Sequence, residues 1–386
     1  MANTISSYLS PYIVGNAIEA LSETMALLKG TNHDFSTAAA AKGQTVSLGV
    51  PQALTAASVT AANTAPAPSA ITIGKRSITL SNEFKTSFAL TGKETQDYEL
   101  SSVVAEQIKE AVRGMAYKVN ATLWAKYTDI PYFVGNSGTG FFASNANGLS
   151  DMDKVLTDNL CPLDNRKFVC GTKDYAALIN LTEVHYANQF GSDSAVRQGV
   201  VGDVRGFEVN RDQQVPTHTI GTITGDPTMG AAAITTNTST ITCDSNDAVA
   251  LKDGDIILID GATYAVQGDL TIGNSDTGTL TVDRNWETAL DGDEALALAT
   301  NFDANSLLAI GGRMDGYSVV GRLPETSPMG YATQGEHMPI VDPVSGFPFL
   351  ISIYPQYKQV ALEVSAIWGV EVTDSRKLCR ALTYSS

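Results

Sequence analysis

The feature that most constrains the fold is a long run of regularly spaced apolar residues between positions 100 and 127. Successive apolar positions step by four, four, four, three, four, four and four residues, which is the spacing of one helical face. They are Leu100, Val104, Ile108, Val112, Met115, Val119, Leu123 and Tyr127. A helix of about 30 residues is roughly 45 Å long, and these steps do not sustain the repeat of a coiled coil. We therefore expect the helix to lie across a sheet as a spine.

The rest of the chain predicts short helices and β-strands, so the expected fold class is α+β. Apolar residues alternate in the manner of a strand before the long helix, at Ile78, Leu80, Phe84, Phe88 and Leu90. Helices are predicted at residues 12–29, 151–159 and 172–180, and strands at 165–171, within 197–216 and in three apolar runs after residue 305.

Residues 217–302 differ from the rest of the chain in charge and in composition. They contain 13 acidic residues against only Lys252 and Arg284, a net charge of −11, whereas the whole chain carries −16. Short runs of β-forming residues alternate with Gly, Asp and Asn turns at intervals of roughly ten residues, which is typical of a small all-β unit. The mixed pattern resumes on both sides. The sequence therefore predicts a β-rich domain inserted at this point.

Residues 43–74 form a stretch of 32 residues without a single charge. It opens with TVSLGV and closes with SAITIG, which are both strand-like, and its middle is Ala, Thr, Ser and Pro. One interpretation is a flexible linker. We favour a long hairpin-like arm, which has too little apolar surface to fold back on its own domain. Such an arm would become ordered by lying across a neighbouring subunit.

Composition excludes several classes of protein. A chain with this acidic excess is a poor general nucleic-acid binder, because phosphate contacts need concentrated Lys and Arg. The chain contains no stretch of about 18 apolar residues, which is the length needed to span a membrane. The first twenty residues lack the pattern of a secretory signal. The cysteines have no CxxC spacing, so we expect reduced and mostly buried thiols at Cys161, Cys170, Cys243 and Cys379.

Motifs for catalysis or cofactor binding are weak. The loop at residues 135–140 reverses the order of a dinucleotide fingerprint and lacks a surrounding βαβ unit. The histidines are far apart in sequence and show no metal-binding spacing, which favours structural roles for His33, His185, His218 and His337. The Asp-Gly pairs at residues 253–255 and 291–294 could hold calcium, but Asp-Gly is also a common hairpin turn. We expect no catalytic residue, no cofactor site and no metal site.

Four phrases, in this order, resemble the Hong Kong 97-type major capsid protein of tailed bacteriophages, in the short-tailed-phage branch with a β insertion domain. They are TSFALTGKE at 86–94, VVGDVRGFEVNRDQQVP at 200–216, GDIILIDGATYAV at 254–266 and AIWGVEVTDSRKLCRAL at 366–382. No single phrase is diagnostic, and the resemblance rests on the ordered set. The family often has Arg-Pro-Glu near the end, where this chain has Asp374, Ser375 and Arg376.

The resemblance implies a Hong Kong 97-type fold with an all-β insertion domain. The implied parts are an N-terminal arm (1–42), an extended β-hairpin loop (43–77), a peripheral domain with the spine helix (78–134), an apical domain (135–216 and 303–344), the insertion (217–302) and C-terminal strands (345–386).

The implied function is the icosahedral shell of a virion, assembled in the host bacterial cytoplasm and without enzymatic activity. The implied partners are further copies in pentamers and hexamers, a separate scaffolding protein, a portal, and packaged DNA bound without sequence specificity. No membrane partner is expected. Two alternatives stay open at this point: a surface or adhesion β-protein whose acidic insertion binds an ion or a glycan, and an enzyme with an unrecognised site.

Overall fold

The computed structural model describes most of the chain. The described residues are 27–50, 74–91, 93, 100–135, 140–185, 198–223, 228–229, 238–245, 248–273, 276–286, 295–298, 306–326, 335–341 and 346–383. The predicted helix at residues 12–29 therefore lies largely outside the described residues. No helix in these ranges is long and apolar enough to cross a membrane.

The long helix predicted from the apolar stripe is confirmed as α3 (Leu100–Ala125). Its buried positions Val112, Met115, Val119 and Leu123 all belong to the largest hydrophobic core. Tyr127 follows in the short 3-10 helix η1 (Lys126–Asp129), just beyond the end of α3. The side chains of the first three stripe residues, Leu100, Val104 and Ile108, lie outside the described residues.

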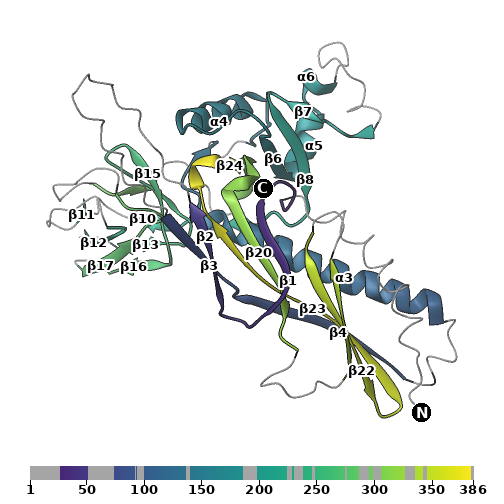
Figure 1. Ribbon diagram of the computed structural model, residues 1–386. Helices are drawn as coiled ribbons and strands as arrows, with labels where there is room; N and C mark the ends of the chain where they lie inside the picture. The colour runs from purple at the N-terminus through teal and green to yellow at the C-terminus, as the bar shows by residue number, and fades with distance from the viewer. Residues whose placement is uncertain are drawn as a thin grey trace, which may run out of the picture.

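A six-stranded sheet packs against α3, which runs across one of its faces as expected (Figure 1). Its strand order is β1 (Asn32–Ala40), β20 (Tyr317–Pro324), β23 (Gln359–Val372), β22 (Pro348–Gln356) and β21 (Glu336–Val341), and β4 (Asn82–Thr91) also pairs with β23. Alternate residues of β23, such as Val364, Ala366 and Trp368, face α3. The next residue, Ile367, packs on the opposite face in a separate small core.

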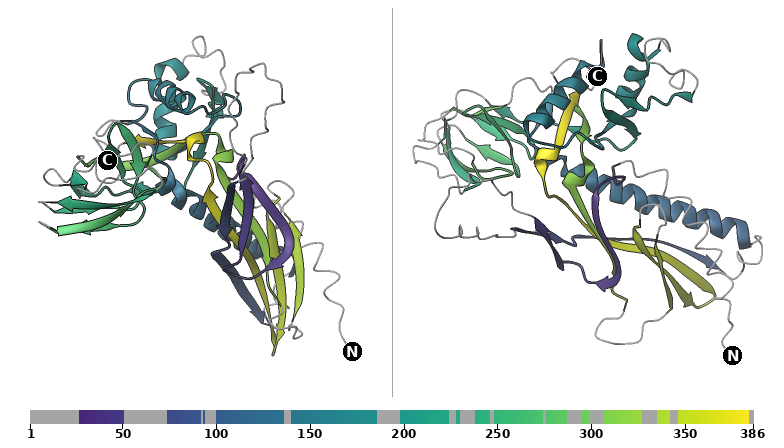
Figure 2. Two further views of the ribbon diagram at one scale, coloured as in Figure 1. Left: turned by 60° about the vertical axis from the view of Figure 1, so that its left-hand side comes forward. Right: turned by 45° about the horizontal axis from the view of Figure 1, so that its top comes forward.

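A second, seven-stranded sheet forms another lobe (Figure 2). It contains β5 (Phe133–Val134), β24 (Leu378–Thr383), β19 (Ser306–Gly312), β6 (Lys167–Gly171), β8 (Phe207–Asp212), β7 (Asp203–Val204) and β9 (Thr217–His218). Its core is shared with the helices α4 (Asn147–Asp158), α5 (Thr172–Ile179) and α6 (Thr182–His185). The helices predicted at 151–159 and 172–180 and the strand at 165–171 are confirmed within a few residues.

The acidic segment folds as strands in the ranges that the structure describes. Three three-stranded sheets contain β10 (Thr222–Ile223), β11 (Thr228–Met229), β12 (Thr240–Ser245), β13 (Val249–Leu251), β14 (Ile256–Ile259), β15 (Ala262–Ala265), β16 (Leu270–Ile272), β17 (Asp276–Thr281) and β18 (Ala297–Leu298). A core of its own joins them, from Ile241 to Leu296. The predicted β character of this segment is therefore confirmed.

The uncharged stretch begins and ends in a two-stranded ladder. β2 (Thr45–Val50) pairs antiparallel with β3 (Gly74–Thr79), so that Val50 is opposite Gly74. The opening strand is confirmed. The closing strand is described from Gly74 onward, and its apolar anchors Ile78 and Leu80 pack beneath the six-stranded sheet. Residues 69–73 of the predicted strand lie outside the described residues. Residues 51–73, the middle of the predicted arm, lie outside the described residues.

Domain boundaries inferred from the sequence stay predictions. Two observations concern these boundaries. First, Thr217 and His218, at the start of the predicted insertion, pair with β19 of the seven-stranded sheet. Second, the segment 303–344 contributes β19 to that sheet, but β20 and β21 to the six-stranded sheet.

Candidate functional site

The histidines are dispersed through the fold. His33 lies 3.1 Å from a backbone carbonyl, and His337 lies 2.8 Å from the hydroxyl of Ser352. His218 is buried between two other side chains, whereas the side chain of His185 lies outside the described residues. Three of the four are hydrogen-bonded, as expected for structural histidines. Among the residues that the structure describes, no three His, Cys, Asp or Glu side chains are grouped to hold a metal ion.

The most elaborate polar cluster, which we call the junction, lies where α3, the seven-stranded sheet and the insertion meet. Nδ1 of His218 is 2.9 Å from the hydroxyl of Tyr127, and Nε2 is 2.9 Å from a carboxylate oxygen of Asp255. With a neutral ring, the Nε2–H group donates to Asp255 and the hydroxyl of Tyr127 donates to Nδ1. The other carboxylate oxygen of Asp255 accepts the backbone N–H groups of Gly221 and Lys252. Asp255 of the insertion is thus bonded directly to His218 of β9 and is linked through the His218 ring to Tyr127 at the helix end.

Arg380 supplies the positive charge of the junction. It lies on β24, is only 1% exposed, and donates from Nη1 to the carbonyl oxygen of Gly254 at 2.7 Å. Its guanidinium also stacks over the ring of Tyr127. Burial lowers the pKa of Arg380 to about 10, and Tyr127, Asp283 and Asp255 partly offset this effect. The side chain therefore stays charged at neutral pH, inside the protein and against the insertion.

The turn that carries Gly254 depends on glycine. Its φ is +88°, and an added Cβ would lie 2.7 Å from Cγ2 of Thr128 at the end of the helical segment. Asp253 closes the turn by accepting the N–H of Gly268 at 2.8 Å. The interpretation of Asp253-Gly254-Asp255 as a turn is confirmed. The second acidic group, at residues 291–294, lies outside the described residues.

A buried carboxylate orders part of the insertion, and the neighbouring arginine contacts the segment before β5. Asp283 accepts the N–H of Ala265 at 2.9 Å and pairs with Arg284 at 3.1 Å. Burial raises the pKa of Asp283, and Arg284 partly offsets that rise. The Arg284 guanidinium lies between Tyr264 of the insertion and Tyr132, which precedes β5, at 4.6 and 5.5 Å from the two ring centroids.

A second buried network joins α3 to the seven-stranded sheet. One carboxylate oxygen of Asp212, at the end of β8, accepts from Asn120 at 2.8 Å and from the indole N–H of Trp124 at 3.0 Å. The other oxygen accepts the N–H of Gln214. On the opposite side, Trp368 of β23 donates to Thr122 at 2.8 Å. Because α3 is bonded to both sheets, it fixes the two lobes relative to each other.

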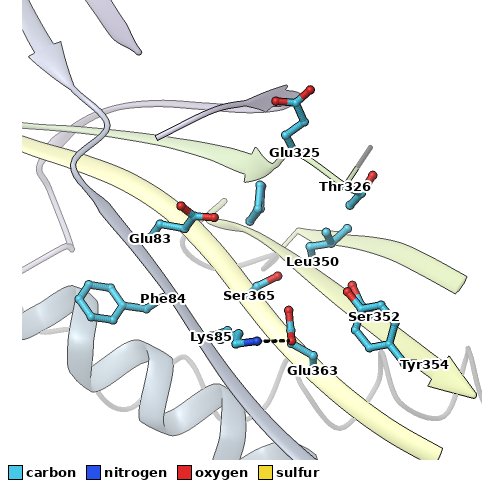
Figure 3. Close-up of a pocket in the computed structure, with 11 residues that line it drawn as sticks. Glu83, Phe84, Lys85, Glu325, Thr326, Leu350, Ser352, Tyr354, Glu363 and Ser365 are labelled. Carbon is cyan, nitrogen blue, oxygen red and sulfur yellow. Dashed lines mark hydrogen bonds and ion pairs between the residues drawn. The ribbon is translucent and has the colours of Figure 1, made fainter. Parts of the chain in front are cut away.

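The face of the six-stranded sheet that points away from α3 carries an open groove of about 460 Å³ (Figure 3). β22 contributes Leu350, Ser352 and Tyr354 to it, and β4 contributes Glu83 and Lys85. Figure 3 shows the ion pair of the groove, in which Lys85 donates to Glu363 of β23 at 3.2 Å. The groove is polar because the alternate positions of these strands, which face α3, take the apolar residues. It is a surface suited to contact, without a buried reactive group.

The four cysteines, predicted to be free and buried, are so in the structure: Cys161, Cys170, Cys243 and Cys379. Burial raises the pKa of each thiol, that of Cys243 to about 11. These thiols are poor nucleophiles. The glycine-rich loop predicted at 135–140 lies mostly outside the described residues, but Gly135 contacts the backbone of Leu382 so closely that a Cβ there would clash.

The sequence placed Tyr127 in the helical stripe, His218 among the structural histidines and Asp255 in a turn. No sequence pattern brought these residues together or added Arg380 to them. Arg380 and Asp255 are 125 positions apart, and nothing near either residue marks it as buried. The one available signal was Arg380 itself, a charged residue within the apolar run LCRAL. The junction bonds the end of the helical segment, the seven-stranded sheet and the insertion to one another. His218 is 5% exposed and Asp255 is 1% exposed, so neither is open to a substrate.

Comparison with known proteins shows similarity in fold. The capsid of cyanophage P-SCSP1u is similar over 95% of this chain and 90% of that chain, with 10% sequence identity and a TM-score of 0.50. The mature capsid of bacteriophage PhiM1 has 10% identity over 93% of this chain and 87% of that one, with a TM-score of 0.47. A protein of Mycobacterium phage Che8 has 11% identity over 88% and 85%, with a TM-score of 0.46. No protein-family model and no curated protein matches the sequence.

The chain therefore has a capsid-like fold that mixes helix and strand. Its likeness to the cyanophage capsid extends over nearly the whole of both chains, so it is not restricted to one common motif. This capsid-like fold agrees with the resemblance to phage capsid proteins that the four sequence phrases indicate.

Proposed function

We propose that this chain is the major capsid protein of a tailed bacteriophage, and that many copies assemble into the icosahedral shell around a double-stranded DNA genome. The observation that carries the proposal is the likeness in fold to the cyanophage P-SCSP1u capsid. A shell subunit performs no chemistry and acts through repeated surfaces. The buried networks of Asp212 and Asp255 suit that role, because they hold the lobes of one subunit in a fixed arrangement.

The parts of the subunit are proposed to be those of a Hong Kong 97-type protein. The six-stranded sheet with α3 would form the peripheral domain, and the seven-stranded sheet with α4 and α5 the apical domain. Under this assignment β20 and β21 belong to the peripheral domain, while the proposed insertion starts after His218. The N-terminal arm is proposed for residues 1–42, with β1 (Asn32–Ala40) as the part that joins the edge of the six-stranded sheet.

Contacts between copies are proposed at two places. One is the hairpin arm, whose paired base is β2 and β3 and whose middle is uncharged. The other is the open groove of Figure 3, which carries Glu83 and the Lys85–Glu363 ion pair. Lys85 and Glu363 neutralise each other, but Glu83 and Glu325 also line the groove. A covering subunit would therefore have to supply donors for these two carboxylates.

Charge suggests how the subunit is oriented in the shell. The insertion carries −11 of the total −16, and acidic surface facing packaged DNA is electrostatically unfavourable. We therefore propose that the insertion faces outward. Contacts with DNA would be without sequence specificity, and a separate scaffolding protein and a portal are proposed as partners during assembly in the bacterial cytoplasm.

Electron microscopy and size-exclusion chromatography of the purified full chain test the proposal. We expect closed shells, or rings of five or six subunits that form shells when a scaffolding protein from the same genome is supplied. A chain that remains an extended monomer under both conditions would favour a surface protein. A small closed oligomer with no ring or shell would favour an enzyme.

A further inference from the structure

The turn between β22 and β23 is made of residues that do not favour it. Gln356 pairs with Gln359 in the last rung of the ladder, so Tyr357 and Lys358 form a two-residue turn. Such turns favour Asn-Gly, Asp-Gly or another glycine pair, because they need positive φ values. Here Lys358 takes the left-handed backbone, with a φ of +58°, which is unfavourable for a residue with a Cβ.

The insertion contains the favoured form of the same turn. Ile259 pairs with Ala262, and the two residues between them are Asp260 and Gly261. Both have positive φ values, of +47° and +77°. The chain therefore uses a stabilising turn sequence in the insertion but not between β22 and β23. Backbone strain that local stability does not require is typical of functional positions.

The hairpin tip, which we define as Tyr357 and Lys358, carries side chains suited to recognition. Figure 1 shows this end of the hairpin projecting from the six-stranded sheet, far from the seven-stranded lobe. Tyr357 is 88% exposed, the highest value among the large apolar side chains described. Nζ of Lys358 lies 5.4 Å from the centroid of that ring, and Lys358 forms no ion pair with a described residue. An exposed aromatic ring of this kind marks a contact site.

The groove of Figure 3 is complementary to the tip in charge. Its lining includes the carboxylates of Glu83, Glu325 and Glu363 but only one cation, Lys85, which pairs with Glu363. Figure 3 shows Glu83 and Glu325 on the same side of that ion pair. Neither of these two carboxylates pairs with a cation among the described residues. The groove can therefore accept hydrogen bonds from a cation that another chain supplies.

We infer that the hairpin tip of one copy binds in the groove of a second copy, where Lys358 donates to Glu83 and Glu325. The ring of Tyr357 then packs against Tyr354 of the groove. The tip cannot enter the groove of its own chain, because β22 and β23 stay paired up to the turn and line that groove themselves. Since tip and groove are different surfaces, the contact is head-to-tail and can repeat around a ring of copies. This inference rests on the proposed function, because it needs a chain that assembles.

Exchange of charges in the full chain tests the contact. Lys358→Glu alone, and Glu83→Lys with Glu325→Lys, each place like charges together and should weaken self-association roughly tenfold or more. A chain with all three changes should recover association, because the charges are again opposite. Lys154→Glu, at an exposed position of α4, is the control for net charge and should have no effect. Sedimentation velocity and electron microscopy measure the association constant and the yield of rings or shells.

The outcomes separate this inference from the proposed function. A wild-type chain that assembles, together with variants that assemble equally well or a combined chain that does not recover, would overturn the inference alone. A wild-type chain that stays monomeric in every condition would overturn the proposed function and the inference together.

A turn replacement separates association from folding. Tyr357→Asn with Lys358→Gly introduces a favoured hairpin turn, so the melting temperature of the subunit should stay the same or rise by up to about 2 °C. Association should nevertheless fall as it does for Lys358→Glu. Asp260→Asn, which keeps a favoured turn in the insertion, should change neither property. Normal assembly of the turn variant, or a lower melting temperature, would show that the tip serves its own chain and would overturn the inference.

Discussion

Nε2 of His218 lies 2.9 Å from a carboxylate oxygen of Asp255, although the two residues belong to different lobes and are 37 positions apart. His218 ends β9 in the seven-stranded sheet, and Asp255 immediately precedes β14 of the insertion. Because both are buried, the bond is shielded from water and competes with no solvent partner. The insertion is thus attached to the subunit by more than its two chain connections, and its angle is set by specific side chains.

The first prediction concerns the close approach beside this bond. Gly254→Ala should destabilise the protein by about 2–5 kcal/mol, because it combines a left-handed backbone with a clash against Thr128. Gly261→Ala is the matched control. Gly261 also has a positive φ, but nothing lies within 4 Å of a Cβ built there, so only the backbone cost of about 1–2 kcal/mol applies. Urea unfolding of the two variants measures the difference. Equal losses would show that the insertion does not press against the end of the helix.

The second prediction uses the raised pKa of Asp283. The folded state keeps this proton to a higher pH than the unfolded state, whose Asp pKa is about 3.9. Stability from this group is therefore present at low pH and is lost as the pH rises from about 4 through the folded pKa. Asp283→Asn removes that dependence while keeping an oxygen that can accept from Ala265. The free energy of unfolding of the wild type relative to the variant should fall as the pH rises through this window.

Asp269→Asn is the control of opposite sign. A hydrogen bond from Lys252 lowers the pKa of Asp269, which lies on the surface. Its contribution is present above the unfolded pKa and is lost as the pH falls through the folded pKa. Urea unfolding between pH 3 and pH 7 checks both variants. The same slope for both would contradict the burial of Asp283.

The third prediction tests the apolar face of α3. Val119→Asp places a carboxylate in the largest core, where Val119 is 0% exposed, and should cost about 4 kcal/mol or more. Gly114→Asp puts the same side chain on the same helix at an exposed position with nothing within 4 Å, and should have little effect. The soluble yield and the melting temperature of each variant are the measurements. A soluble, normally melting Val119→Asp protein would mean that this face is not buried.

Local sequence pattern predicted the elements whose signal is repeated along the chain. The helix was predictable because its apolar spacing recurs through two dozen residues, and tertiary packing follows the same stripe from Val112 to Leu123. The strands of the insertion were predictable because Gly and Asp mark each turn between them, as at Asp253-Gly254. The strand character around Ile78 was predictable from the alternation of Ile78 and Leu80, and both residues pack in a small core beneath the sheet.

Long-range pairing accounts for what the sequence did not predict. β1 runs parallel to β20, with Asn32 opposite Ser318, and no local pattern identifies a partner so far along the chain. The junction has the same origin, since Tyr127, His218, Asp255 and Arg380 come from four separate segments. No pattern within any of these segments identifies the other three residues as partners. Only the fold shows that these buried side chains bond to one another in place of water.

The fourth prediction concerns the thiols. Burial raises the pKa of Cys243 to about 11, so at pH 8 only about one molecule in a thousand carries the reactive thiolate there. Ellman's reagent should therefore label none of the four cysteines in the folded chain and all four after unfolding in urea. Ser144→Cys, at an exposed position, should add one rapidly labelled thiol per chain. Rapid labelling of a native cysteine would show that its lobe opens readily in solution.

The last prediction concerns the proposed arm. Deletion of residues 52–68 removes the uncharged middle but keeps the ladder in which Thr45 is opposite Thr79 and Val50 is opposite Gly74. The stretch has only two large apolar side chains, Leu54 and Val59, which are too few to anchor a core. We therefore expect a soluble subunit whose melting temperature is within a few degrees of that of the wild type, but which forms no stable shells in electron micrographs. A second variant, in which residues 52–68 are replaced by Gly and Ser at equal length, separates length from sequence: shells should again fail if the arm makes specific contacts with a neighbour. Normal shell yield and normal shell stability in both variants would remove the arm from the assembly mechanism.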